Sequence, residues 1–328
     1  MRARKQKKRP VSVRTKTGRF AIREGTEANA MSEIDRLLLL QGHIACRLQP
    51  KGRINRLSDV EFSVSSQFGE DGIIEWLVDK LDPKSTKFIE FGVENFHESN
   101  CRFVMQNRNW KGFVIDSSKE RIAELAKRQY YWMHHLVSTA AFVTSENINY
   151  LIEASGFSGQ IGILSIDIDG NDYWVWDAIN VCQPDIVIVE YNSFLGDRYA
   201  VTIPYQPDFN RFAAHPSGRY CGASLPALQQ VAETKGCTLV GSNSAGTNAF
   251  FVRNALAWPV LDTIADRRAL PTRMRHSRTR DGGFAFHRHA RDVAALLSRL
   301  PVVDVVTGET TTFGDLAEPY SEEWLQHL

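Results

Sequence analysis

The sequence predicts an α/β fold whose centre is a doubly wound, mostly parallel sheet of seven strands. Short apolar segments recur along the middle of the chain, roughly 20 to 30 residues apart with helical segments between them, which is typical of βαβ units. The first segment ends in a glycine turn, as strands do when they lead into a ligand site at a sheet edge. The last two segments are joined by 242–247, which is too short for a crossover helix, so they must form an antiparallel hairpin.

Each expected strand is a short apolar run bounded by polar or turn-forming residues. The strands are 87–91, 110–118, 134–140, 160–166, 184–192, 237–241 and 248–253. Helices are expected where apolar residues recur at helical spacing or where a capping residue opens a segment. They are 32–47, 71–81, 98–108, 119–128, 145–155, 173–179, 224–235 and 289–300.

Charge and motif content divide the chain into three expected regions. The 328 residues carry 39 basic and 38 acidic side chains, but residues 1–30 hold ten basic and two acidic ones. Because this stretch lacks apolar periodicity, we expect a disordered, solvated basic tail. The less favoured alternatives are that it binds nucleic acid or an anionic membrane surface. An alternative is that Met31 is the true start, since Ser32 after it is a helix-start signal. Residues 31–254 are expected to form the α/β domain, and 255–328 an extension packed on it or partly flexible.

Cysteine content and hydropathy indicate a cytoplasmic protein. The five cysteines are odd in number and far apart, and none has the spacing of a zinc site or a disulfide framework. No apolar run is long enough to span a membrane, and the N-terminal residues lack the apolar core of a secretory signal.

The stretch 86–100 predicts one half of a ligand site. A buried strand breaks at Gly92, and a helix is expected from His97 or Glu98 to about Arg108, so backbone N–H groups would point at a ligand above the sheet edge. Glu90 and Glu94 add carboxylates, which suit a ligand with hydroxyls or an ammonium group. The alternative is that Gly92 only makes a turn and the acids only cap the helix.

Asp116 ends the next strand, 24 residues after Gly92. In open α/β sheets, an acid at this spacing accepts hydrogen bonds from a ribose diol. The alternative for Asp116 is an N-cap of the following helix.

Acidic and amide side chains at the ends of the fourth and fifth strands predict a second half-site. Asp167, Asp169, Glu190 and Asn192 come from adjacent strand ends and can converge. Of these, Asp167, Glu190 and Asn192 form a hard-oxygen set suited to Mg²⁺. Such an ion would lower the pKa of an acceptor hydroxyl. Alternatively the acids cap the next helix and Asn192 makes a turn; without a metal, Asp169 or His215 is a possible base.

Two later segments could recognise an acceptor. The connection 194–222 is too long for a passive link and is a candidate lid. The stretch 267–280 holds six arginines, which could bind phosphate or uronate or could be a solvated face. His287 and His289 are expected at exposed helix positions.

Four motifs resemble the FkbM-type branch of class I S-adenosylmethionine-dependent methyltransferases. They are SQFGEDG, IEFGVENFHESNCRF, NWKGFVID and SIDIDGNDYW, and the resemblance covers roughly 65–253. A parallel sheet with a terminal antiparallel hairpin is also the layout of that class. The chain departs from the pattern at Phe96, where many relatives have a second glycine.

The resemblance implies roles for residues along the cofactor. Glu90, Gly92 and Glu94 would line its methionine end, with Glu90 facing the ammonium. Asp116 and Ser117 would hold the ribose end. The same resemblance places three further side chains near the cofactor and one where cofactor and acceptor meet. These are Gln67 and Glu70 on the carboxylate or sulfonium side, Ser138 near the adenine, and Asp167 beside the acceptor.

The resulting expectation is an S-adenosylmethionine-dependent methyltransferase that modifies a sugar hydroxyl of a glycan or small-molecule acceptor. One alternative is a glycosyltransferase whose Asp167–Ile168–Asp169 binds a metal and a nucleotide sugar. Another is a catalytically silent, methyltransferase-like binding module, which the loss of glycine at Phe96 would suit.

Overall fold

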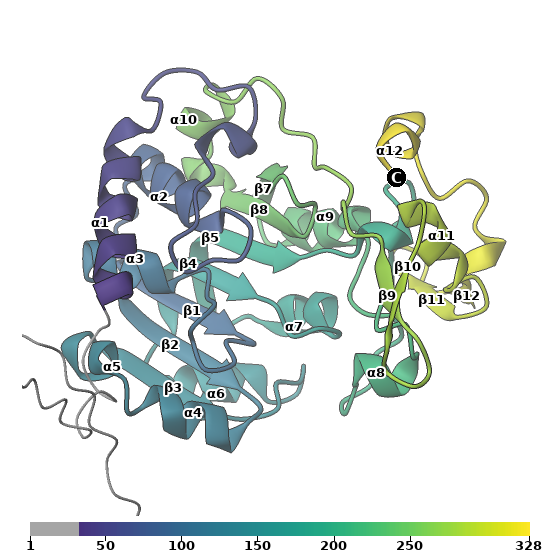
Figure 1. The fold of residues 1–328 in the computed structure, drawn as a ribbon, viewed down its shortest axis with the longest axis horizontal. Helices are drawn as coiled ribbons and strands as arrows, with labels where there is room; N and C mark the ends of the chain where they lie inside the picture. The colour runs from purple at the N-terminus through teal and green to yellow at the C-terminus, as the bar shows by residue number, and fades with distance from the viewer. Residues whose placement is uncertain (1–32) are drawn as a thin grey trace, which may run out of the picture.

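A computed structural model describes residues 33–328 and has a seven-stranded sheet at its centre (Figure 1). The expected basic tail and the alternative start at Met31 lie outside the described residues. The strand order is β3-β2-β1-β4-β5-β8-β7. The strands are β1 (Lys87–Phe91), β2 (Lys111–Asp116), β3 (Leu136–Ala140), β4 (Gly159–Ile166), β5 (Cys182–Glu190), β7 (Cys237–Ser242) and β8 (Asn248–Arg253).

The hairpin prediction is confirmed, because β8 pairs antiparallel with both β5 and β7. The other neighbouring pairs are parallel. Their order changes direction between β1 and β4, and in such sheets a ligand binds at the carboxyl ends beside this switch point. The predicted doubly wound, mostly parallel α/β fold is therefore correct.

Helices cover both faces of the sheet, since two separate apolar clusters are buried against it. Alternate strand residues face opposite ways, so Phe88 packs in one cluster and Ile89 in the other. The first cluster includes residues of α2 (Glu70–Leu81), α3 (Arg102–Arg108), α4 (Lys119–Leu125) and α10 (Trp258–Leu261). The second includes residues of α6 (Ile148–Ser155), α7 (Asp172–Ala178) and α9 (Leu225–Thr234).

The remaining helices are α1 (Glu33–Leu48), α5 (Gln129–Met133), α8 (Arg211–Ala214), α11 (Ala290–Ala295) and α12 (Glu322–His327), with short 3₁₀ turns η1 (Leu57–Val60), η2 (Ser193–Leu195), η3 (Asn254–Leu256) and η4 (Phe313–Asp315). None of the helices within 33–328 is both long enough and apolar enough to cross a membrane.

The C-terminal region packs against the segment that follows β5. Strand β11 (Pro301–Asp304) pairs with β12 (Thr310–Thr312) and with β6 (Val201–Thr202) of that segment. Strands β9 (His276–Arg278) and β10 (Phe284–Phe286) form a separate hairpin. Figure 1 shows β1, β4 and β5 pointing toward the side of the molecule where α8 and this hairpin lie. The β9–β10 hairpin and α8 therefore lie opposite the carboxyl ends of these strands (Figure 1).

Helix α3 begins later than the sequence predicts. The helix expected from His97 or Glu98 begins at Arg102, and residues 94–101 form turns. The Glu90 carboxylate accepts hydrogen bonds from the backbone N–H groups of Asn100 and Cys101. These donors are therefore satisfied outside a helix, which holds the preceding residues as a loop.

Candidate functional site

A cleft of about 610 Å³ lies at the carboxyl ends of β1, β2, β4 and β5. Its volume is in the range of sites that bind small molecules or cofactors. Strand-end residues, among them Glu90, Asp116, Asp167 and Glu190, form one side of it. The other side comes from residues 209–219, which belong to the predicted lid, and from residues 274–284.

Gly92 brings the ends of β1 and β4 into contact at the floor of the cleft. Its φ of +75° is a conformation that side-chain-bearing residues rarely adopt. A Cβ atom at this position would lie 1.6 Å from the backbone oxygen of Asp167. Only glycine therefore allows these two strand ends to meet as they do.

Asp116 is buried at the end of β2, and both of its carboxylate oxygens are oriented by the backbone. Oδ2 accepts a hydrogen bond from the Glu94 N–H at 2.8 Å, and Oδ1 accepts one from the Ser118 N–H at 2.8 Å. A carboxylate has about four lone-pair positions, so each oxygen retains capacity for a ligand hydroxyl. Ser118, not Asp116, caps α4, because its hydroxyl accepts from the Arg121 N–H.

Glu90 lines the same cleft and is held by the loop before α3. Its carboxylate accepts hydrogen bonds from the Ser99 hydroxyl at 2.7 Å and from the N–H groups of Asn100 at 2.7 Å and Cys101 at 3.2 Å. Burial raises the pKa of Glu90 to about 7, although these hydrogen bonds favour the charged form. A cationic ligand group beside Glu90 would stabilise its carboxylate.

Phe96 keeps the left-handed backbone that a glycine would supply. Its φ is +61°, and its side chain is fully buried. The ring packs against Tyr130, with 6.0 Å between the ring centroids. Burial of the ring offsets the backbone strain, so the turn exists without the second glycine.

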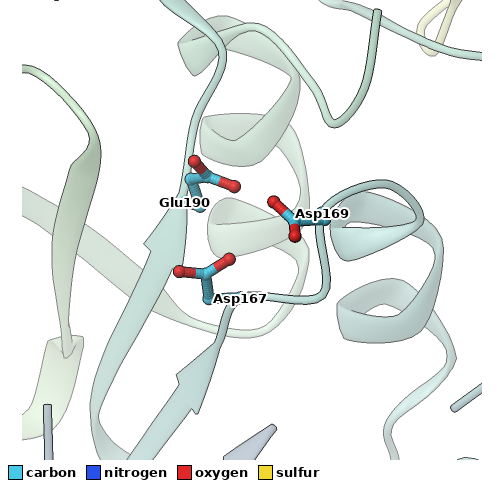
Figure 2. A group of neighbouring side chains, drawn as sticks. All are labelled: Asp167, Asp169 and Glu190. Atoms are coloured by element: carbon cyan, nitrogen blue, oxygen red, sulfur yellow. The ribbon is translucent and has the colours of Figure 1, made fainter. Parts of the chain in front are cut away.

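Three carboxylates converge at the ends of β4 and β5. Asp167, Asp169 and Glu190 each offer an oxygen within 4.8 Å of the others, and Figure 2 shows them facing a common space. Burial, followed by repulsion from neighbouring carboxylates, raises the pKa of Asp167 and of Glu190 well above the usual values. Arg211, the first residue of α8, forms an ion pair with Asp169.

Asn192 was expected with Asp167 and Glu190 as a metal ligand, and in the structure its side chain is held by the backbone. Its side-chain N–H groups donate to the backbone oxygens of Arg219 and Cys221, and its side-chain oxygen caps η2. Asp169 lies with Asp167 and Glu190 in a cluster of three carboxylates.

Two other predicted residues do not line the cleft. His215 bonds through Nδ1 to the Ser217 hydroxyl at 2.7 Å, and burial lowers its pKa. The Ser138 hydroxyl on β3 pairs with the Tyr131 hydroxyl at 3.2 Å. Neither residue is among those that line the cleft, although Ser217, the partner of His215, is.

The other predicted residues line the cleft but differ in how exposed their side chains are. Gln67, Glu94 and Ser117 are exposed there, and Glu94 forms an ion pair with Arg121 at 3.2 Å. Glu70 is buried, and its carboxylate accepts from the Phe68 N–H and from the side-chain amides of Asn243 and Asn248. Glu70 therefore anchors the loop 243–248 to α2.

Sequence reasoning missed several residues that line the cleft. Asn171 and Asn248 are buried there, and the side-chain oxygen of each has no hydrogen-bond partner among the described residues. Arg211, Arg219 and His276 also line it. The only sequence signals for them were the long connection 194–222 and the arginine-rich stretch 267–280.

No protein-family model matches this chain, and no curated protein matches it. Among solved structures, an S-adenosylmethionine-dependent methyltransferase from Clostridium acetobutylicum is 11% identical, with a TM-score of 0.36, over 56% of this chain and 89% of that chain. An O-methyltransferase family protein from Burkholderia thailandensis is 9% identical, with a TM-score of 0.33, over 56% of this chain and 57% of that one. The [4+2]-cyclase SpnF is 11% identical, with a TM-score of 0.34, over 63% of this chain and 72% of its own.

Methyltransferase and cyclase names thus both occur among chains with this degree of likeness. A fold hosts many reactions, so the function of this chain has to be argued from the residues of its own cleft.

Proposed function

We propose that this protein is an S-adenosylmethionine-dependent methyltransferase. The observation that carries the proposal is that Glu90 and Asp116 line one cleft together with Gly92. A buried acid at the end of the second strand suits a ribose diol, and an acid at the first suits an ammonium group. S-adenosylmethionine presents both groups on one molecule.

The cleft residues fit this cofactor in three respects. Each Asp116 oxygen has one backbone donor and spare capacity for a hydroxyl hydrogen. An ammonium group beside Glu90 would favour the charged form of its carboxyl group, whose pKa is raised by burial. Gly92 lets β1 and β4 approach closely, so that Asp167 lies in the same cleft as Glu90 and Asp116.

S-adenosylmethionine would supply a methyl group bonded to a positively charged sulfur. The acceptor oxygen must lose its proton as it is methylated, so a nearby base is required. Asp167 and Glu190 are suited to this role because both line the cleft and burial raises the pKa of each, which makes each carboxylate a stronger base. Arg211 beside Asp169 would help to orient the acceptor or the carboxylates.

The finer assignment follows the motif resemblance to FkbM-type enzymes, with a sugar hydroxyl of a glycan or small molecule as acceptor. Asp167, Asp169 and Glu190 would hold a Mg²⁺ ion, since three oxygen ligands whose oxygens lie within 4.8 Å of one another suit a hard cation. Such an ion would fix the acceptor hydroxyl and make it more acidic. The free state of all five cysteines agrees with a reducing, cytoplasmic setting.

Calorimetric titration with S-adenosylhomocysteine, the product form of the cofactor, tests the proposal. We expect saturable binding, and a loss of about 10- to 100-fold in affinity for Asp116→Asn, because charge-assisted hydrogen bonds to the ribose are weakened. Asp177→Asn, at an exposed position of α7 outside the cleft, is the matched control. If UDP-glucose binds and S-adenosylhomocysteine does not, the protein is instead a nucleotide-sugar enzyme. Binding of neither rejects both enzymes.

The metal assignment has its own test. Titration with Mn²⁺, followed by electron paramagnetic resonance, should show one bound ion that is lost in Glu190→Gln and retained in Asp177→Asn. Failure of wild-type protein to bind Mn²⁺ would remove the metal and leave Asp167 and Glu190 as the base.

A further inference from the structure

The wall of the cleft opposite Glu90 and Asp116 contains a half-buried arginine without an anionic partner. Six arginines among residues 33–328 are buried or half-buried, and five of them form ion pairs. The five pairs are Arg56–Asp266, Arg102–Asp35, Arg108–Glu75, Arg211–Asp169 and Arg253–Asp185. Arg219 is the sixth, and it forms no ion pair with any described residue.

Neutral groups hold the Arg219 guanidinium in place. Its Nε donates to the backbone oxygen of His276 at 3.0 Å, one Nη pairs with His276 Nε2 at 2.7 Å, and the other approaches the Met274 sulfur at 3.5 Å. A guanidinium has five N–H donors, so the three contacts leave N–H groups on both terminal nitrogens for another partner. Burial, together with the neighbouring Arg211 guanidinium, lowers the pKa of Arg219. This cation is therefore oriented but not neutralised.

A second cation lies on the same wall. Arg278 of the β9–β10 hairpin lines the cleft, and its backbone N–H donates to the Ser217 oxygen at 3.1 Å, which ties the hairpin to the segment that carries Arg219. The Arg278 guanidinium lies 4.5 Å from the ring centroid of Phe284 and 5.6 Å from that of Phe212. It too forms no ion pair with a described carboxylate. His276 contacts the Arg219 guanidinium. Burial, and then the positive charges of Arg219 and Arg278, lower the pKa of His276.

Charge is thus separated across the cleft. Glu190 and Asp169 are close enough to Arg219 to act on it electrostatically, yet they lie with Asp167 in the cluster at the strand ends. Burying a cation is unfavourable unless it is paired, and a guanidinium suits the two oxygens of a carboxylate or phosphate. The exposed rings of Phe212 and Phe284 offer an apolar face next to this position.

We propose that the acceptor is an anion, and that Arg219 and Arg278 bind its carboxylate or phosphate group. The acceptor then spans the cleft, with its oxyanion at these arginines and its hydroxyl near Asp167 and Glu190. This inference rests on the proposed methyltransferase function for the word acceptor, but anion binding by Arg219 can be measured independently of that function.

The test compares matched sugars in calorimetric titrations of protein saturated with S-adenosylhomocysteine, at fixed ionic strength. Glucuronate and glucose 6-phosphate represent the two oxyanions, and glucose is the neutral control. We expect at least one charged sugar to bind about tenfold or more tightly than glucose. The tighter of the two charged sugars identifies the carboxylate or the phosphate as the preferred group.

Variants identify the residue responsible. Arg219→Gln should remove the preference for the charged sugar, and Arg219→Lys should restore part of it because the charge is kept. Arg275→Gln, at an exposed position outside the cleft but in the arginine-rich stretch 267–280 that contains Arg278, should keep the preference. Circular dichroism would confirm that each variant is folded.

Two failures are distinguishable. If S-adenosylhomocysteine binds but charged sugars bind no better than glucose, the anionic acceptor is rejected and the methyltransferase proposal survives. If S-adenosylhomocysteine does not bind, the methyltransferase proposal fails, and the same sugars are titrated without it. An Arg219-dependent preference for the charged sugars would then keep the anion site, and its absence would overturn it.

Discussion

Replacing Gly92 by alanine tests how the cleft is built. The added Cβ would lie 1.6 Å from the backbone oxygen of Asp167, and φ at this position is +75°. A left-handed backbone costs a non-glycine residue about 1–2 kcal/mol. Overlap with a strand end that cannot rotate away adds about 1–3 kcal/mol, the usual range for overpacking. We therefore expect Gly92→Ala to lower the free energy of unfolding by about 2–5 kcal/mol.

Gly156→Ala is the matched control for this prediction. Gly156 follows α6 with a φ of +78°, but a Cβ there would meet no atom within 4 Å. Its replacement should cost only the conformational part, about 1–2 kcal/mol. Urea unfolding followed by circular dichroism measures both values. If Gly92→Ala costs no more than Gly156→Ala, close contact between β1 and β4 is not what requires glycine.

Two further predictions concern the buried residues around this turn. Phe96→Gly should be less destabilising than Phe96→Ala by about 1 kcal/mol in urea unfolding, because both lose the buried ring but only alanine keeps the strain of φ +61°; alanine as the more stable variant would contradict this. The folded-state pKa of Glu90, about 7, lies above the ordinary value of 4.5, so the folded state holds more protons than the unfolded state between these values. Stability should therefore fall as pH rises from 4.5 to 7, and less steeply in Glu90→Gln than in wild type. The exposed Glu124→Gln is the control, and equal slopes in all three proteins would refute the assignment.

Much of the fold could be predicted because local signals were sufficient. Apolar runs bounded by polar residues mark β1, β2, β4 and β5 within one or two residues at most ends. The antiparallel arrangement of β7 and β8 follows from link length alone, since no crossover helix fits between them.

Sequence reasoning failed where the hydrogen-bond partner of a residue lies far from it in the sequence. The start of α3 was misplaced because Glu90, ten and eleven residues earlier, accepts from the N–H groups of Asn100 and Cys101. The contacts of the Asn192 side chain were missed for the same reason, since its Nδ2 donates to the backbone oxygens of Arg219 and Cys221. None of these hydrogen bonds produces a periodic pattern in the sequence from which it could be predicted.

The side of the cleft that carries Arg219, His276 and Arg278 could not be predicted for a similar reason. Arg219 and His276 are 57 positions apart, and their contact depends on how the β9–β10 hairpin packs against the segment after β5. The sequence of an arginine-rich stretch does not distinguish side chains that are solvated from side chains that line a cleft. Only Arg278 of the six arginines in 267–280 lines the cleft.

The most direct measurement of the central claim is a crystal structure of the protein with S-adenosylhomocysteine bound. The account predicts that both ribose hydroxyls lie within hydrogen-bonding distance of the Asp116 carboxylate, and that the amino group lies on the Glu90 side of the Gly92 turn. A nucleoside bound elsewhere, or one whose ribose does not touch Asp116, would contradict it.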